Sequence, residues 1–327
     1  MFIATHSNPK DFLKFFKSFH DIVEISNILI SENGMLINGF DSLKTSIVDS
    51  NISSKIFSSF NYTFPDESVL ISIYTSTFSS LDNSVTKDDK MILEIDESLE
   101  TLNITLENNT RKTKFLLKLV SLDEDIQEFD MKYTIKLKMP ISNFISACDD
   151  IKTVKSEKVT FKIRDSRIII VGNGELGKTK SEWKFKHDKI DFDSEDISTK
   201  RIKLENIDDN ESSSPTSKLV NKQNVKSVDD KGTKNDNKIK IKIKMPSKKI
   251  TKKRKKPDNI NKIVKFDANS NFAITFGISL IEKILKISSI CSLVEFSLAA
   301  DLPLKLHFAF DEDESSYLDY YIAPKVN

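Results

Sequence analysis

Apolar residues recur along the chain with two periods, one typical of helices and the other of strands. Residues 10–22 (KDFLKFFKSFHDI) repeat apolar side chains every three to four positions, and residues 141–151 (ISNFISACDDI) follow the same pattern. Each predicted helix precedes two alternating runs that flank a polar turn, in residues 25–42 and 158–174. Each pair of runs predicts a β-hairpin.

The same arrangement recurs elsewhere in the chain. Residues 73–82 (IYTSTFSSLD) and 276–286 (FGISLIEKILK) are predicted helices. Three strand-like runs follow each of them, at 90–96, 101–107 and 112–120 in the first case and at 292–299, 304–310 and 317–324 in the second. One helix with several antiparallel strands thus occurs four times, which predicts an α+β chain built of two similar domains.

Residues 193–265 break this pattern because they contain no Phe, Tyr or Trp. A segment so poor in large apolar residues cannot bury enough surface to offset its ordering entropy, so we predict a disordered insertion. Residues 191–230 carry a net charge of −4, whereas residues 231–257 carry +12. The tract 248–257 (KKITKKRKKP) is typical of a nuclear localisation signal or a nucleic-acid-binding segment, with a solvated charged loop as the alternative.

The glycine-rich stretch 172–179 (GNGELGKT) fits two nucleotide-binding patterns, GxxxxGK[ST] and GxGxxG. Both patterns place a phosphate at the start of a helix that follows the glycines. The residues after this stretch instead alternate, with Trp183 and Phe185 set between lysines, which favours a strand. We therefore predict a hairpin turn. A nucleotide hydrolase is the alternative, and it requires a helix directly after Thr179.

Composition narrows the class of protein. A length of 327 residues suggests about two domains. Two cysteines cannot form a disulfide framework, which favours a reducing compartment. The four histidines are scattered, the N-terminal region lacks the apolar core of a signal peptide, and no apolar run reaches the ~20 residues of a membrane span. We expect an intracellular protein that is not secreted, with no membrane association, no metal site and no cofactor.

Several short stretches carry a family resemblance through their order along the chain. They are MLINGFDSLKTSIV (35–48), LVSLDEDIQEFDMKY (119–133), KMPISNF (138–144), GNGELG (172–177), SLAADLPLKLHF (297–308) and YLDYYIAPKV (317–326). Together they resemble the proliferating cell nuclear antigen family of DNA sliding clamps. The stretch at 119–133 is similar to the connector between the two domains of that family, and GNGELG is similar to one of its turns.

The resemblance implies a ring of three subunits around double-stranded DNA, with helices lining the hole and antiparallel sheets outside. Each subunit would have an N-terminal clamp domain at 1–118, a connector at 119–133 and a C-terminal clamp domain at 134–327, interrupted by 193–265. Such a ring is loaded by a clamp loader, and it tethers DNA polymerase and other replication or repair enzymes through their clamp-binding peptides. It is a processivity factor without catalytic activity. We expect it in a nucleus or at a cytoplasmic viral replication site.

The resemblance also implies which residues act. Phe40, Lys44, Ile126, Phe129, Pro303, Tyr321, Ala323 and Pro324 would form the groove for a partner peptide that carries a Gln, an aliphatic residue and paired aromatics. The residues facing DNA would be Lys10, Lys14, Lys17, His20, Lys152, Lys283 and Lys286. Arg164 stands where many relatives carry a lysine that accepts a ubiquitin-like modifier, and arginine cannot form that isopeptide bond.

Ring closure is expected to use two edge strands. A strand near 111–118 of one subunit would pair with a strand near 178–186 of the next, with Lys112, Lys114 and Lys118 set against Glu182. Two alternatives accompany this homotrimer. One is a specialised clamp subunit of a hetero-oligomer, and the other is a general nucleic-acid-binding protein that acts through 248–257.

Overall fold

A computed structural model describes residues 1–120, 131–164, 167–184, 262–266 and 272–325. Every helix and strand below belongs to one unit of the chain, made of residues 1–190 with 256–327. The predicted insertion at 193–265 lies outside the described residues except for its last four positions.

The first half of the fold alternates helices with groups of antiparallel strands. In chain order its elements are β1 (Phe2–His6), α1 (Pro9–Phe19), β2 (Ile25–Ser31), β3 (Gly34–Phe40), β4 (Ser46–Ser53), the 3₁₀ turn η1 (Ser54–Ile56), β5 (Ser59–Tyr62), β6 (Ser68–Tyr74), α2 (Thr75–Ser80), the 3₁₀ turn η2 (Leu81–Ser84), β7 (Lys90–Ile95), β8 (Thr101–Glu107) and β9 (Lys112–Lys118).

The second half repeats the α-helices and strands of the first in the same order, which confirms the predicted pair of similar domains. Its elements are β10 (Ile135–Pro140), α3 (Ile141–Thr153), β11 (Lys158–Arg164), β12 (Arg167–Gly174), β13 (Gly177–Lys184), β14 (Lys262–Phe266), β15 (Phe272–Gly277), α4 (Ile278–Ile284), the 3₁₀ turn η3 (Leu285–Ser289), β16 (Leu293–Leu298), β17 (Leu304–Ala309) and β18 (Tyr317–Ile322). Thus β4 corresponds to β13, and β9 corresponds to β18.

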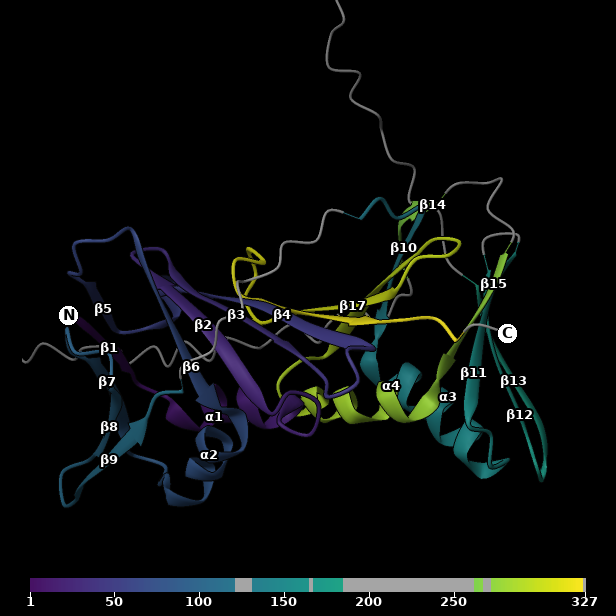
Figure 1. The fold of residues 1–327 in the computed structure, drawn as a ribbon. Coiled ribbons are helices and arrows are strands. Elements are labelled where there is room, and N and C mark those ends of the chain that lie inside the picture. Colours follow the sequence, from purple (N-terminus) through teal and green to yellow (C-terminus); the bar gives the residue numbers. More distant parts are fainter. Residues whose placement is uncertain (121–130, 165–166, 185–261, 267–271, 326–327) are drawn as a thin grey trace, which may run out of the picture. The chain divides into compact units, whose positions relative to one another are not determined.

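The strands form three antiparallel sheets (Figure 1). The first half alone makes the five-stranded sheet β5-β1-β7-β8-β9, and the second half alone makes the four-stranded sheet β13-β12-β11-β15. The nine-stranded sheet, β14-β10-β16-β17-β18-β4-β3-β2-β6, contains strands of both halves. The halves meet where β18 pairs with β4, from Tyr317 opposite Asn51 to Ile322 opposite Ser46.

Figure 1 shows the helices together on one side of the sheets, and α1 contacts α2, α4 and η3. Helix α1 begins at Pro9, whose missing N–H costs nothing at a first helical position. Its phenylalanines face inward, with Phe16 only 1% exposed and its ring 4.4 Å from that of Phe78 in α2. Helix α3 buries Phe144 against Phe296 of β16 in the same way. Each buried ring contributes about 1.5–3 kcal/mol.

The predicted helices at 73–82 and 276–286 are shorter in the structure. Ile73 and Tyr74 complete β6, because they pair with Ser26 and Ile25 of β2. In the second half, Phe276 and Gly277 likewise complete β15 against β11. Pairing with a neighbouring strand therefore overrides the local helical pattern at the start of each segment.

The end of the predicted insertion is also corrected by the structure. Residues 262–265, placed in the disordered span from their composition, belong to strand β14. The backbone of β14 pairs with β10, with Ile263 opposite Leu137 and Phe266 opposite Ile135. The backbone hydrogen bonds with β10 hold this segment as a strand, and composition alone does not predict them.

The glycine-rich stretch is a hairpin turn between β12 and β13, as predicted. Gly174 lies opposite Gly177, and strand β13 follows at once, so no helix begins after Thr179. Gly177 has a φ of +144°, which favours glycine. A Cβ on Gly174 would lie 2.0 Å from the carbonyl oxygen of Val154, so this glycine lets the hairpin pack against the end of α3.

We expect Gly174→Ala to destabilise the chain by about 1–3 kcal/mol, because the added methyl group meets backbone atoms that cannot move aside. Urea denaturation measures the change. Lys178→Ala, in an exposed position of the same hairpin, is the control, and we expect its midpoint to match the wild type within about 0.5 kcal/mol. An unchanged midpoint for Gly174→Ala would contradict tight packing of the hairpin on α3.

Candidate nucleic-acid and partner-binding surfaces

The predicted DNA-facing residues lie on the exposed side of the helices, but most of them are already in ion pairs. Lys17 Nζ lies 2.9 Å from Asp82, and Lys14 Nζ lies 3.4 Å from Asp11. Lys152 contacts Asp149 at 3.6 Å and Glu282 at 3.5 Å. His20 and Lys286 both contact Asp21, and the hydrogen bond from Lys286 lowers the pKa of that carboxyl group. Within the described residues, Lys10 and Lys283 have no ion-pair partner.

The surface formed by the helices is therefore only weakly positive. The four α-helices together with the 3₁₀ turns η2 and η3 carry six lysines, Lys10, Lys14, Lys17, Lys152, Lys283 and Lys286, and five carboxylates, Asp11, Asp82, Asp149, Asp150 and Glu282. Exposed ion pairs contribute little stability, about 0–1 kcal/mol each, so a polyanion can displace them at small cost.

Four residues on neighbouring strands form a row where the peptide groove is predicted. Phe40 lies opposite Ile47, Ile47 opposite Tyr321, and Tyr321 opposite Lys305, on the neighbouring strands β3, β4, β18 and β17. The Lys305 ammonium lies 5.4 Å from the centre of the Tyr321 ring. Burial raises the pKa of the Tyr321 hydroxyl, so this side chain stays neutral at physiological pH. The structure thus brings together Phe40 and Tyr321, which are far apart in the sequence.

A tight loop places Lys44 at the end of this row. Asp41 holds the loop, because its carboxylate accepts hydrogen bonds from the backbone N–H groups of Thr45 and Ser46, both at 2.6 Å. Burial alone would raise the pKa of Asp41, but these hydrogen bonds lower it below its usual value. Lys44 has a φ of 53°, and its ammonium lies 5.6 Å from the centre of the Phe40 ring.

The remaining predicted groove residues lie at the ends of the same strands. Pro303 directly precedes β17, while Ala323 and Pro324 directly follow β18. The Ala323 N–H donates a 2.9 Å hydrogen bond to the Thr45 carbonyl, which ties this end to the Lys44 loop. Ile126 and Phe129 lie outside the described residues, so their placement in the groove stays a prediction.

Three residues that lie beside the predicted groove residues were not predicted from the sequence: Ile47, Lys305 and Tyr133. Ile47 and Lys305 lie there only through strand pairing. Tyr133 is buried to 6% exposure, and burial raises its pKa, with a further contribution from nearby Tyr321. Its place as the last residue of the predicted connector was the only sequence signal that could have found it.

The two strands expected to close a ring both lie at the edge of a sheet. In the described part of the chain, β9 pairs only with β8 and β13 only with β12. Leu116 of β9 is 68% exposed, which is unusual for a leucine in a strand. Glu182 of β13, however, already contacts Arg167 at 2.8 Å and Lys180 at 3.0 Å. The pairing of Glu182 with the lysines of β9 stays a prediction, and β13 carries three lysines beside this one acid.

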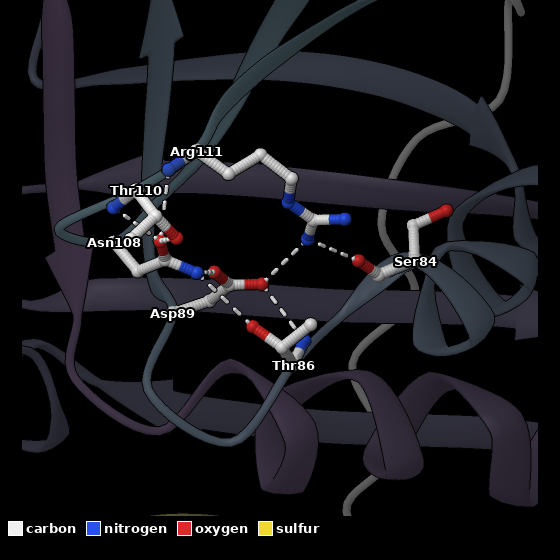
Figure 2. A network of polar contacts seen from close by, with 6 residues as sticks. All are labelled: Ser84, Thr86, Asp89, Asn108, Thr110 and Arg111. Carbon is white, nitrogen blue, oxygen red and sulfur yellow. Dashed lines mark hydrogen bonds and ion pairs between the residues drawn. The ribbon is translucent and has the colours of Figure 1, made fainter.

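A buried polar network holds the start of β9 in place (Figure 2). The Asp89 carboxylate, whose side chain is 0% exposed, accepts hydrogen bonds from the Thr86 N–H at 2.8 Å and from Asn108 Nδ2 at 2.6 Å. Arg111, the residue before β9, lies 2.8 Å from Asp89 and also donates to the Ser84 carbonyl at 2.7 Å. The network therefore joins the loop after α2 to the turn that leads into the edge strand.

Three further observations concern the described residues. No helix among them is both long and apolar enough to cross a membrane. They include no group of three or more His, Cys, Asp or Glu placed to hold a metal ion. Cys148 and Cys291 are free and buried, and burial raises the pKa of each thiol to about 12.

Two family models match the chain. The model of the proliferating cell nuclear antigen N-terminal domain matches residues 1–128, and that of its C-terminal domain matches residues 226–325. A DNA polymerase sliding clamp of Methanococcus vannielii is 24% identical over 192 residues, which cover 58% of this chain and 74% of the relative. DNA polymerase sliding clamp 3 of Sulfurisphaera tokodaii is 20% identical over 167 residues, which cover 51% and 66%.

A solved structure shares the fold along nearly its whole length. The crystal structure of proliferating cellular nuclear antigen from Entamoeba histolytica matches with a TM-score of 0.68, 14% sequence identity and 99% coverage of both chains. At this identity the match shows the fold alone.

We expect Asp89→Asn to destabilise the chain by about 2 kcal/mol, because a charged hydrogen-bond acceptor inside the network is lost. Burial alone would raise the pKa of Asp89, but its hydrogen bonds with Thr86 and Asn108 and the charge of Arg111 lower it. The stabilisation is therefore complete above the unfolded pKa of about 3.9 and is lost as the pH falls through the lower folded value.

Chemical denaturation at pH 7 and at pH 3 tests this expectation. The difference between wild type and Asp89→Asn should shrink at the lower pH. Asp88→Asn removes an exposed neighbouring carboxylate and is the matched control, with an expected change within about 0.5 kcal/mol. Equal effects of the two substitutions would show that the network does not stabilise the fold.

Proposed function

This chain belongs to the proliferating cell nuclear antigen family of DNA sliding clamps, and we propose that three copies of it close a ring around duplex DNA. Family membership carries the function in its general form, that of a processivity factor for a DNA polymerase. The family acts without catalysis, and we propose the same for this chain. A clamp loader would open the ring, because a closed ring cannot enter an endless duplex from the side.

One observation carries the proposal of a closed ring. The two halves repeat each other, so two equivalent strand pairings are possible, but only one of them is made among the described residues. The last strand of the second half, β18, pairs with the fourth strand of the first half, β4. The equivalent strands, β9 and β13, are edges in the described part of the chain. A pairing of β9 with β13 of another copy would repeat the internal junction, and repeated head-to-tail junctions close a ring when the rotation is right.

The helix surface would face the DNA in this ring. Its six lysines include Lys10 and Lys283, which are free of ion pairs among the described residues. Few strong phosphate contacts suit a protein that slides, because each phosphate contact strengthens binding without selecting a sequence. His20 completes the proposed DNA-facing set, together with Lys14, Lys17, Lys152 and Lys286.

The surface around Phe40 and Tyr321 would dock the partner enzymes. We propose that it binds a short peptide with a Gln, an aliphatic residue and paired aromatics, and that Ile126 and Phe129 of the connector complete the groove. Aromatic side chains bury about 150–250 Å² each, which is enough for a few of them to dominate a small interface. Replication and repair enzymes that share such a peptide would then compete for one site.

A second candidate function is a subunit of a hetero-oligomeric clamp, and one observation favours it. Both edge strands are lysine-rich, with Lys112, Lys114 and Lys118 on β9 and Lys178, Lys180 and Lys184 on β13. Like charges on two edges repel each other, whereas an acidic edge on a different chain would attract. In either case the clamp would work where a genome is copied, in a nucleus or at a cytoplasmic viral replication site.

We expect the purified chain to have a solution mass three times its 37.3 kDa. Because the edges repel, the trimer should tighten when salt rises from 0.1 M to 1 M, as the Debye length falls from about 10 to about 3 Å. Light scattering over a range of protein concentrations measures both effects. A monomer at micromolar concentration in both salt conditions would reject the homotrimer and leave the hetero-oligomer.

We expect Phe40→Ala to weaken binding of a peptide with a Gln, an aliphatic residue and paired aromatics at least tenfold, or by about 1.4 kcal/mol, because part of the apolar wall is lost. Calorimetry with the intact chain measures the affinity. Leu36→Ala is the matched control, since Leu36 lies on the same side of β3 and is 38% exposed. Equal affinities of the two variants would reject this groove.

A further inference from the structure

The solvent-facing side of the four-stranded sheet is strongly basic. Strands β11, β12 and β13 carry seven cations and one acid, Glu182. The opposite side is apolar, with Val159, Phe161 and Ile163 at most 2% exposed. Because side chains alternate along a strand, the cations gather on one side. They are Lys158, Lys162, Arg164, Arg167, Lys178, Lys180 and Lys184, and each is exposed.

Strand pairing sets these cations in rows. Arg164 lies opposite Arg167, and Arg167 lies opposite Lys184, so three cations stand side by side on neighbouring strands. At the other end of the sheet, Lys158 lies opposite Gly277, and the Nζ of Lys325 is 4.0 Å from the position that a Cβ on Gly277 would take. Like charges directly opposite each other destabilise a sheet.

Protection of a sheet edge does not explain this arrangement. Lysines on an edge strand prevent unwanted pairing, and β13 is such an edge. Strand β11, however, lies inside the sheet between β12 and β15, and it carries Lys158 and Lys162. Within the described residues neither of these two lysines has an ion-pair partner. The charge therefore extends beyond what edge protection requires.

We propose that this side of the sheet is a second nucleic-acid surface, which binds the phosphate backbone of duplex DNA from outside the ring. Cations two residues apart on one strand, such as Lys178 and Lys180, are separated by about 6.6 Å, which is close to twice the 3.4 Å rise per phosphate of one DNA strand along the helix axis. The contact is non-specific, since phosphate contacts carry no sequence information.

The chemistry of the surface favours nucleic acid over an acidic protein. A protein partner anchors itself through apolar or aromatic side chains in pockets. Here the residues between the cations are Thr160, Ile169, Val171 and Asn173, of which the isoleucine and valine are only half-exposed. The outward side of these strands thus offers charge but no large exposed apolar side chain; exposed Leu176 lies in the hairpin turn beyond them. This side also exceeds the helix surface in net charge, by +6 against +1.

A covalently closed duplex circle tests the proposal, because a closed ring cannot encircle it without a loader. We expect Lys158→Ala with Lys162→Ala to weaken binding of the full chain about tenfold at 0.1 M salt. The slope of log K against log salt should fall by about 1.8, the value for two phosphate contacts. Lys55→Ala with Lys87→Ala removes the same charge from exposed positions outside this sheet, and its affinity and slope should equal those of the wild type.

Three outcomes would overturn the proposal. Wild-type affinity and slope in the Lys158 and Lys162 double variant would place the phosphate contacts elsewhere in the chain. Equal losses in both double variants would show that only net charge matters. If the Lys158 and Lys162 double variant lost binding to polyglutamate but kept its DNA binding, the surface would be assigned to an acidic protein. The melting midpoint and solution mass of each variant are measured in parallel, so misfolding or a failure of ring assembly is recognised separately.

Discussion

The pairing of β18 with β4 is the constraint on which the rest of the fold depends. It joins two similar halves through six residue pairs, from Tyr317 opposite Asn51 to Ile322 opposite Ser46, and so makes one nine-stranded sheet. Backbone hydrogen bonds between buried strands cannot be given up without leaving polar groups unpaired. The pairing therefore fixes the register between halves, and it places Phe40 of β3 in one row with Tyr321 of β18.

The same constraint explains the two edges. Each half of the duplicated fold has one strand equivalent to β4 and one equivalent to β18. The pairing of β18 with β4 uses one strand of each kind, so the other two remain at sheet edges. In the described residues these are β9 and β13, and the Asp89 network holds the residue that precedes β9. In the proposed ring, this edge would pair with another chain. Its lysines oppose self-pairing, so ring formation would depend on salt and on the partner's charge.

Positive charge is distributed unevenly between the helix surface and the four-stranded sheet. Ion pairs such as Lys17 with Asp82 neutralise much of the helix surface, whereas the outer side of the four-stranded sheet carries an excess of cations. A weakly positive helix surface favours loose contacts with DNA, and a basic outer surface would add a second, non-specific contact. The two surfaces lie on opposite sides of α3 and the sheet that covers it.

The sequence by itself determined the duplicated α+β architecture, the helices α1 and α3, and the hairpin at 172–179, because these follow from local periodicity and glycine placement. It also predicted Phe40, Lys44 and Tyr321 as one surface, but only through the family resemblance. Tertiary structure decided what depends on contacts between distant residues. Strand pairing shortened the predicted helices at 73–82 and 276–286, set Ile47 and Lys305 in one row with Tyr321, and placed Glu182 near Arg167. No local pattern encodes such contacts, since they depend on which strand lies beside which and in what register.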